Sequence, residues 1–213
     1  MPGASTPPPG PMATVHGRVE DLATDLGVPG AAVTVAGSPG SAVRTGEDGE
    51  FVLDVGSHVL STVRVEHPDY LATRLPVYAT GDPAEPAIEL PVLPAVVLAR
   101  KLEEAGVDPQ SPDRGLVLVD FLLLPPERGQ SAELSLDHGG VLAFVGEGSV
   151  TDGGSGLGPG ADLLLFTNVV PGRTPVSLGT PTGRCSLVDS TLNINDFVVR
   201  AGELTAVGVR CVP

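Results

Sequence analysis

The sequence predicts an all-β protein of two tandem seven-stranded β-sandwiches of Greek-key type, joined by a short helix. The apolar residues are mostly Val, Leu and Ala, and they alternate with polar residues in short segments, which is typical of half-buried strands. The chain has 28 Gly and 22 Pro in 213 residues, so we expect many turns and few long helices. A series of strand and turn signals occurs at Thr14–Tyr70 and again, more loosely, at Gly115–Cys211.

Residues 1–13 form a Pro-rich leader that we expect to be disordered. Runs of Pro, Gly and small polar residues are typical of flexible or polyproline-like spacers. The leader has neither the basic nor the apolar region of a signal peptide. Our hypothesis is that an export signal has been removed and that the leader was a spacer from a cell-surface anchor, as in a lipoprotein.

The first sandwich is expected over residues 14–93. Gly27-Val28-Pro29-Gly30 and Gly46-Glu47-Asp48-Gly49 mark two of its turns. The Asp-Gly step is a strong hairpin signal because Gly accepts a positive φ, so the strands on either side of it should pair with each other. The expected strands are 14–21, 31–36, 43–45, 50–55, 59–66, 70–78 and 87–93.

One amphipathic helix interrupts the strand pattern. Pro94 lies at its first turn, Gly106 closes it, and Leu98, Leu102 and Ala105 recur at helical spacing. The connector that follows contains Asp-Pro and Ser-Pro steps. Residues 94–114 are therefore predicted to be the helix and linker between the two sandwiches.

The second sandwich is expected over residues 115–213. In its strand near the C-terminus, the alternation predicts that Leu192, Ile194 and Val198 face inward. The Gly- and Ser-rich stretch between Gly146 and Gly160 is expected to be a loop, and loops of this length are functional or mobile. The expected strands are 115–121, 132–136, 163–172, 175–178, 186–188, 192–199 and 203–212.

The first repeat resembles the carboxypeptidase regulatory-like domain, a transthyretin-like (prealbumin-like) sandwich found as an accessory module on peptidases, receptors and surface proteins. Residues 115–212 are similar to a divergent second copy, in which Phe166–Gly172 matches the family's hairpin but the Asp-Gly turn is missing. The resemblance implies a binding, spacing or stabilising role and brings no catalytic residues. Its motifs are Gly-x-Val at 17–19, Gly-Val-Pro-Gly-Ala-x-Val-x-Val at 27–35, Thr-Gly-x-Asp-Gly-x-Phe at 45–51 and x-Pro-x-Tyr at 67–70.

Charge excludes several classes of partner. The formal net charge is −14, and no cluster of Lys or Arg stands out in the sequence, so nucleic acids and anionic membranes are disfavoured. No segment approaches the ~20 apolar residues that cross a bilayer, so the chain is not expected to span a membrane. Two interpretations of the acidic surface remain, a solvated coat that keeps the protein soluble and weak cation binding.

Cys185 and Cys211 are the only cysteines, and both lie in strand-like segments. We expect a disulfide between neighbouring strands, which in the chain-entropy model stabilises the fold by about 3.5 kcal/mol. The alternative is a pair of buried free thiols. A metal or redox site is disfavoured because there is no CxxC spacing and no nearby histidine.

The remaining polar residues form no recognised catalytic or metal motif. His58 and His67 are metal candidates only if they meet at one end of the first sandwich; zinc needs a third ligand and iron would need Tyr70 and Tyr78 to join them, so we interpret both histidines as structural or surface residues. The stretch around Ser155 fits neither a nucleophile elbow nor a phosphate loop. The other candidates, all interpreted as surface or turn residues, are His16 and His138 and the candidate calcium ligands Asp152, Asp162, Asp189, Asn193, Asn195 and Asp196.

These observations predict no catalytic residue, no metal and no cofactor. The function predicted is a non-catalytic exported accessory or interaction module, structural or adhesive, at an extracellular, periplasmic or cell-surface location. Its partner would be another protein or a surface polymer. The alternative is a carbohydrate-binding module, which the absence of Trp disfavours and which a pocket exposing Tyr70 and Tyr78 together would support. A third hypothesis, a metal-dependent enzyme, requires convergent His or carboxylate ligands.

Overall fold

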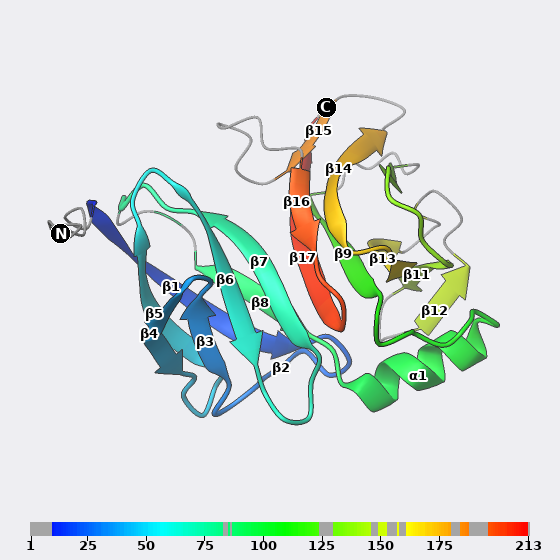
Figure 1. Ribbon diagram of the computed structural model, residues 1–213, viewed down its shortest axis with the longest axis horizontal. Coiled ribbons are helices and arrows are strands. Elements are labelled where there is room, and N and C mark those ends of the chain that lie inside the picture. Colours follow the sequence, from blue (N-terminus) through cyan, green and yellow to red (C-terminus); the bar gives the residue numbers. More distant parts are fainter. Residues whose placement is uncertain are drawn as a thin grey trace, which may run out of the picture.

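The computed structural model describes residues 10–82, 85, 87–123, 130–145, 149–152, 157, 161–179, 184–187 and 196–212 (Figure 1). Across these residues the protein is all-β with one helix, which confirms the predicted all-β class but not the division into two separate sandwiches, because one sheet runs through both halves. The first strand begins at Met12, so the expected leader is too long at its C-terminal end, while residues 1–9 lie outside the described part. None of the described helical residues forms a segment long and apolar enough to cross a membrane.

The N-terminal half is a sandwich of two sheets. In one, β1 pairs with β2 and β5 in antiparallel fashion and with β8 in parallel. In the other, the strand order is β4-β3-β6-β7. Alternate apolar residues of the two sheets form a common core, including Val15, Val19, Leu53, Val63 and Val77. The bounds are β1 (Met12–Asp21), β2 (Leu26–Gly27), β3 (Ala32–Val35), β4 (Ser38–Arg44), β5 (Glu50–Gly56), β6 (Leu60–Glu66), β7 (Ala72–Tyr78) and β8 (Ile88–Val92).

The predicted hairpin at Gly46–Gly49 is wrong, because the two strands that flank this turn belong to different sheets. β4 pairs with β3, and β5 pairs with β1. The buried Thr45 donates a hydrogen bond from Oγ1 to the Val28 carbonyl oxygen at 2.7 Å, and the Gly49 carbonyl accepts one from the Val19 amide at 2.9 Å. Gly49 has the expected positive φ of 79°. The local signal marks the turn correctly, but long-range bonds direct the chain across the sandwich.

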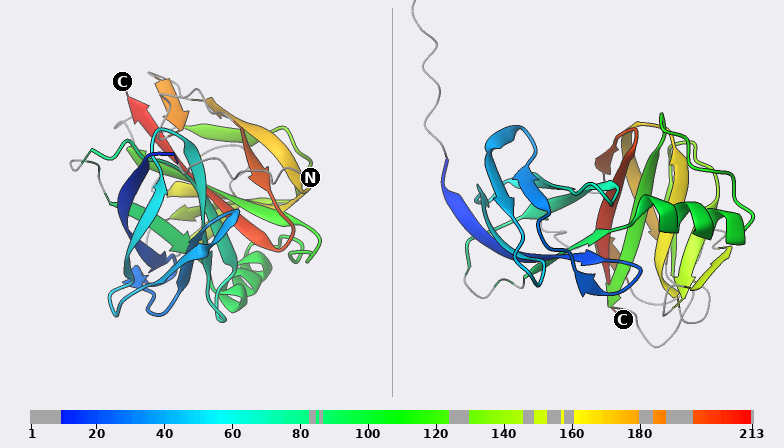
Figure 2. Two further views of the ribbon diagram at one scale, coloured as in Figure 1. Left: turned by 60° about the vertical axis from the view of Figure 1, so that its left-hand side comes forward. Right: turned by 90° about the horizontal axis from the view of Figure 1, so that it is seen from below.

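The predicted helix is confirmed as α1 (Ala95–Glu104), which buries Leu98 and Leu102. Pro94 precedes it in an extended conformation, and Gly106 follows with a positive φ of 68°. Figure 2 shows α1 lying across the strands of the C-terminal half.

The C-terminal half is also built from two layers. One layer has the order β12-β11-β13-β9-β17, with β15 also paired to β17, and the other has the order β10-β14-β16. The sequence did not indicate β11, and β12 occupies part of the expected 146–160 loop, where Leu157 is also buried. The bounds are β9 (Gly115–Leu123), β10 (Ser131–Leu134), β11 (Val141–Val145), β12 (Ser149–Asp152), β13 (Ala161–Val169), β14 (Gly172–Gly179), β15 (Arg184–Leu187), β16 (Asp196–Val199) and β17 (Glu203–Val212).

The two halves share one sheet. β17 pairs in parallel with β7, with Thr205 opposite Arg74, so that a ten-stranded sheet runs through both halves (Figure 1). We call the β7–β17 pairing the seam.

The second layers lie on opposite faces of this shared sheet. Leu204 and Ala206 of β17 pack with α1, whereas Val207 and Val209 pack with the β10-β14-β16 layer. In register with Leu204, the buried Thr73 of β7 lies on the face that the β1 sheet covers in the N-terminal half. The second layer therefore covers one face of the shared sheet in the N-terminal half and the opposite face in the C-terminal half. Beside the seam, each face of the sheet thus has an uncovered step, which we call a ledge.

Candidate functional site

The histidine and tyrosine candidates do not come together. His58 precedes β6 and His67 follows it, so they lie at opposite ends of a seven-residue strand and do not meet. Each histidine packs edge-on against a different tyrosine, with ring centroids 6.3 Å apart for His58–Tyr78 and 5.1 Å for His67–Tyr70. Because the two histidines lie apart and each packs against a different tyrosine, these four residues form no common metal centre.

The two tyrosines also line different hollows, so they form no shared platform for a sugar. The Tyr70 hydroxyl donates to Asp21 Oδ2 at 2.9 Å. Burial, together with this hydrogen bond to Asp21, raises the pKa of Tyr70 to about 12. Tyr70 is therefore a structural link between β1 and the chain before β7.

The other sequence candidates are dispersed. His16 and Asp162 are exposed, and His138 packs against Phe166 with ring centroids 5.1 Å apart. Within the described ranges, no three His, Cys, Asp or Glu side chains are placed to hold a metal ion. Asp152 and Asp196 belong to β12 and β16. The candidates Ser155, Asp189, Asn193 and Asn195 lie outside the described residues.

A groove of about 500 Å³ lies on one ledge of the seam. Its floor is the outer face of β6 and β7, which is the face that the N-terminal core does not use. Its wall is the β14–β16 layer of the C-terminal half. We call it the arginine groove, and its lining residues are Ala36, Gly37, Leu60, Thr62, Arg74, Pro76, Arg173, Phe197, Val198, Arg200 and Thr205.

Strand alternation places the arginines in this groove. Arg74 is in register with Arg64 of β6 and with Thr205 of β17, so these three side chains share one face of the sheet. In the wall, Arg173 of β14 is in register with Val198 of β16. Arg200 follows β16 directly, before a turn in which Gly202 has a positive φ of 70°.

A shared carboxylate orders the floor of the groove. Glu203 of β17 is 13% exposed and pairs with both Arg64, at 3.0 Å, and Arg74. Arg64 also pairs with Glu66. These ion pairs connect β6 and β7 of the N-terminal half to β17 of the C-terminal half. Arg64, Arg74, Arg173 and Arg200 thus gather in and beside one groove of a protein of net charge −14.

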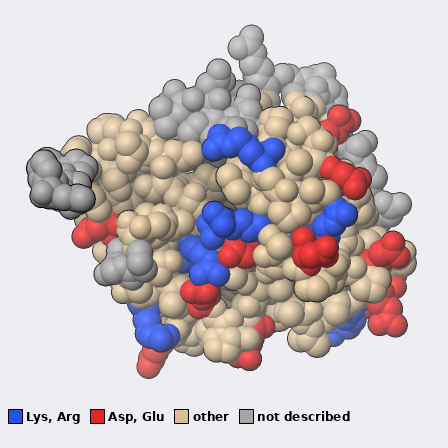
Figure 3. All heavy atoms as spheres, in the orientation of Figure 1, with Lys and Arg blue, Asp and Glu red and all other residues tan. Residues whose placement is uncertain are grey.

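The space-filling view shows this concentration of charge directly. Basic side chains gather near the middle of the face drawn in Figure 3, where Figure 1 places the meeting of β6 and β7 with β16 and β17. Two partly exposed apolar residues, Leu60 at 41% and Val198 at 43%, lie among them. The groove therefore combines hydrogen-bond donors of fixed positive charge with apolar contact surface, a combination suited to binding.

Sequence reasoning missed this groove. Its arginines come from distant positions with no regular spacing, so the sequence contains no signal that groups them. The predicted orientation of Val198 is wrong, because Phe197 is buried and Val198 points into the groove. A displacement of one residue in the assumed alternation reverses every side chain of a strand.

A second hollow, of about 280 Å³, lies on the other ledge of the seam. Leu75 and Val77 of β7, Ile88 of β8 and Ala206 of β17 line it together with Asp120 of β9, and we call it the Asp120 cleft. Burial, reinforced by the neighbouring carboxylates of Asp162 and Glu89, raises the pKa of Asp120 to about 7. A single carboxylate within the apolar run 116–124 was the sequence signal for this position.

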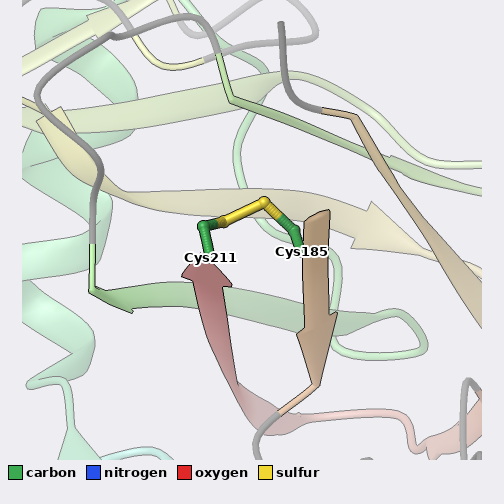
Figure 4. The surroundings of a disulfide bond; sticks show 2 residues. All are labelled: Cys185 and Cys211. Atoms are coloured by element: carbon green, nitrogen blue, oxygen red, sulfur yellow. A yellow bond between two sulfur atoms is a disulfide. The ribbon is translucent and has the colours of Figure 1, made fainter. Parts of the chain in front are cut away.

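The predicted disulfide is present. Cys185 and Cys211 are register partners on β15 and β17, and a disulfide joins them (Figure 4). Cys211 is buried in the core of the C-terminal half, and Cys185 packs against that core. The bond therefore fastens β15 to β17, the strand that carries Glu203 at its other end.

No family model and no curated protein matches the chain. Among solved structures, the Bacillus anthracis TIE protein is 13% identical with a TM-score of 0.29, over 94% of this chain, which spans about a third (34%) of that protein. The shaft pilin SpaA of Lactobacillus rhamnosus GG is 8% identical with a TM-score of 0.30, over 95% of this chain and 99% of that one. A streptococcal ancillary pilin is 14% identical with a TM-score of 0.27, over 95% and 63%. Similarities this distant carry no argument about function.

Proposed function

We propose that the protein is a non-catalytic exported interaction module that binds another protein or a surface polymer through the arginine groove. The observation that carries this proposal is the collection of Arg74, Arg173 and Arg200 in one concave site of a strongly acidic protein. An anionic partner is repelled by most of an acidic surface and attracted to such a site, so the groove selects where contact occurs.

Arginine is well suited to this role. Its planar guanidinium presents several donors in a fixed fork that matches carboxylate geometry, and it stays charged at any physiological pH. The exposed Leu60 and Val198 add apolar surface that a partner buries on contact. The shared sheet supports the proposal further, since it holds floor and wall together and limits the ordering cost of binding.

An extracellular, periplasmic or cell-surface location is part of the proposal. Disulfides persist in oxidising compartments and are rare in reducing ones, and the Cys185–Cys211 bond is of the structural kind. We also infer that residues 14–93 and 115–213 are two modules of the carboxypeptidase regulatory-like type. Two sheets packed around an aliphatic core in the first segment support this assignment.

The test is direct binding of anionic probes by fluorescence anisotropy. Labelled poly-L-glutamate represents an acidic protein segment, and labelled hexagalacturonate represents an acidic surface polymer. The Arg173→Gln/Arg200→Gln variant is expected to weaken binding of at least one probe by about tenfold at low salt. Arg100→Gln, which removes an exposed arginine on α1, is the matched control and should leave binding unchanged. If neither probe binds, or if the control variant loses binding equally, the proposal is refuted.

A further inference from the structure

We propose that the occupant of the arginine groove is an extended peptide segment of another protein, in which acidic side chains alternate with apolar ones and which adds to the edge of β16. This inference rests on the proposed function and specifies its partner. It follows from the shape of the ledge, the backbone of β16 and the composition of the lining.

The ledge is shaped to accommodate one additional strand next to β16. In the C-terminal half, the β10-β14-β16 layer covers β9 and β17, and this layer ends with β16 beside the seam. The next strands of the shared sheet, β7 and β6, have their outer faces open in the groove. Packed sheets lie about 10 Å apart, so a strand added beside β16 would cover β7 as β16 and its neighbours cover β17.

The backbone of β16 provides for this addition. β16 pairs with β14 on one side, and no strand in the described part of the chain pairs with its other side. An edge strand presents N–H and C=O groups that no neighbouring strand pairs, and an extended peptide uses such groups when it joins a sheet; in β16 the Val198 carbonyl already accepts a hydrogen bond from Thr205 Oγ1 at 3.4 Å. β16 has four residues, so an added segment of about four to six residues spans it at about 3.3 Å per residue.

The side chains of the groove then determine the composition of the peptide. Alternate residues of an added strand point to opposite faces, so each face meets one kind of surface. Toward the shared sheet lie Arg74 and Leu60, at separate positions along β7 and β6, and beside β16 lie Arg173 and Arg200. A guanidinium has five N–H donors, so a peptide carboxylate can pair with Arg200 and also with Arg74, whose Nε already donates to Glu203; small apolar side chains match Leu60 and Val198.

An acidic polysaccharide fits this lining less well. Besides the charge pairs that its carboxylates can make, a sugar ring commonly stacks on an exposed aromatic face. Phe197 contributes the aromatic ring of the lining, but it is only 5% exposed because it belongs to the core, and the chain contains no Trp. The lining therefore favours a peptide over a polysaccharide.

The experiment measures the affinity of the full chain for a fluorescent six-residue peptide of alternating Glu and Val. Four comparison probes are used, namely the same peptide N-methylated at alternate residues, a Lys–Val peptide, a scrambled Glu–Val peptide with its Glu residues together, and hexagalacturonate. The alternating peptide is expected to bind at least about tenfold more tightly than any of these, since N-methylation removes the donors that pair with β16.

Two matched exposed valines test the position of the peptide. Val198→Glu places a carboxylate in the groove and is expected to weaken binding about fivefold or more by like-charge repulsion. Val96→Glu makes the same change on α1, where Val96 is 76% exposed, and should not alter binding. Circular dichroism and thermal unfolding verify that both variants fold.

The outcomes separate this inference from the proposed function. Arginine-dependent binding of hexagalacturonate alone, or equal binding of the N-methylated peptide, overturns strand addition and leaves the groove as a binding site. Equal affinity of the scrambled peptide overturns the alternating pattern. If no anionic probe binds, both proposals fail.

Discussion

The Asp120 cleft allows a quantitative prediction about stability. Asp120 lies on β9 at the ledge opposite the arginine groove, among apolar side chains and near two other carboxylates. The perturbation is Asp120→Asn, which keeps the size and shape of the side chain but removes its charge. We expect this variant to be more stable than the wild type, and increasingly so as the pH rises.

The sign and the magnitude follow from the pKa of Asp120 in the two states. In the folded protein the pKa of Asp120 is raised to about 7, whereas the ordinary pKa of an aspartate side chain is 3.8. Between these values the unfolded chain loses the proton while the folded protein retains it, so the wild type loses stability as the pH rises through this window. Each unit of pKa difference is worth about 1.4 kcal/mol, which gives an upper limit of about 4 kcal/mol above pH 7.

The variant should therefore exceed the wild type by about 2 kcal/mol at pH 5.5 and by up to about 4 kcal/mol at pH 8. The assay is urea unfolding at both pH values, followed by circular dichroism. Asp108→Asn is the control, because Asp108 is an exposed carboxylate on the connector. Asp162→Asn removes a charge that raises the pKa of Asp120, so it should shift the pH window toward acid. A stability gain in Asp120→Asn that is equal at both pH values, or a loss at pH 8, would refute the reasoning.

Three further changes test the seam, the disulfide and the turn between the sheets. Glu203→Gln removes the carboxylate that two arginines share, and we expect urea unfolding to show a loss of about 1–3 kcal/mol. Replacing both Cys185 and Cys211 by Ser opens a loop with a sequence separation of 26, which should cost about 3.5 kcal/mol and make thermal unfolding insensitive to reductant. Gly49→Ala and Gly30→Ala both place a side chain at positive φ (79° and 73°), but only a Cβ at Gly49 meets backbone atoms within 4 Å. Gly49→Ala should therefore be the less stable by about 1–3 kcal/mol in the same assay.

Each of these predictions can fail in a distinct way. Unchanged stability on removal of the Glu203 carboxylate would mean that the ion pairs do not hold the seam. A reductant effect that persists in the double-serine variant would place the sensitivity elsewhere than the disulfide. Equal losses for the two glycine variants would mean that conformational strain, and not crowding, sets the cost at Gly49.

Local chemistry was sufficient for much of the fold. Alternation located most strands to within a few residues, the positions of Pro94 and Gly106 bounded the helix, and Gly49 has the positive φ that an Asp-Gly turn requires. The two cysteines were paired correctly because both lie in strand-like segments near the C-terminus. These features depend on residues that are close in sequence or, for the disulfide, on the fact that two cysteines can form only one pair.

The sequence could not predict which distant segments pair with each other. The alternation of apolar and polar residues indicates which residues share a face of a strand, but not which strands are neighbours. The turn after Thr45 crosses between sheets, and β17 joins β7, because of bonds formed far along the chain. That joining moves the covering layer from one face to the other, and the resulting ledges collect the arginines on one side and isolate Asp120 on the other. The sequence by itself determined that the chain forms strands around aliphatic cores. Only the tertiary structure decided where its charges meet, because electrostatic attraction and burial depend on distances in space that the order of residues does not specify.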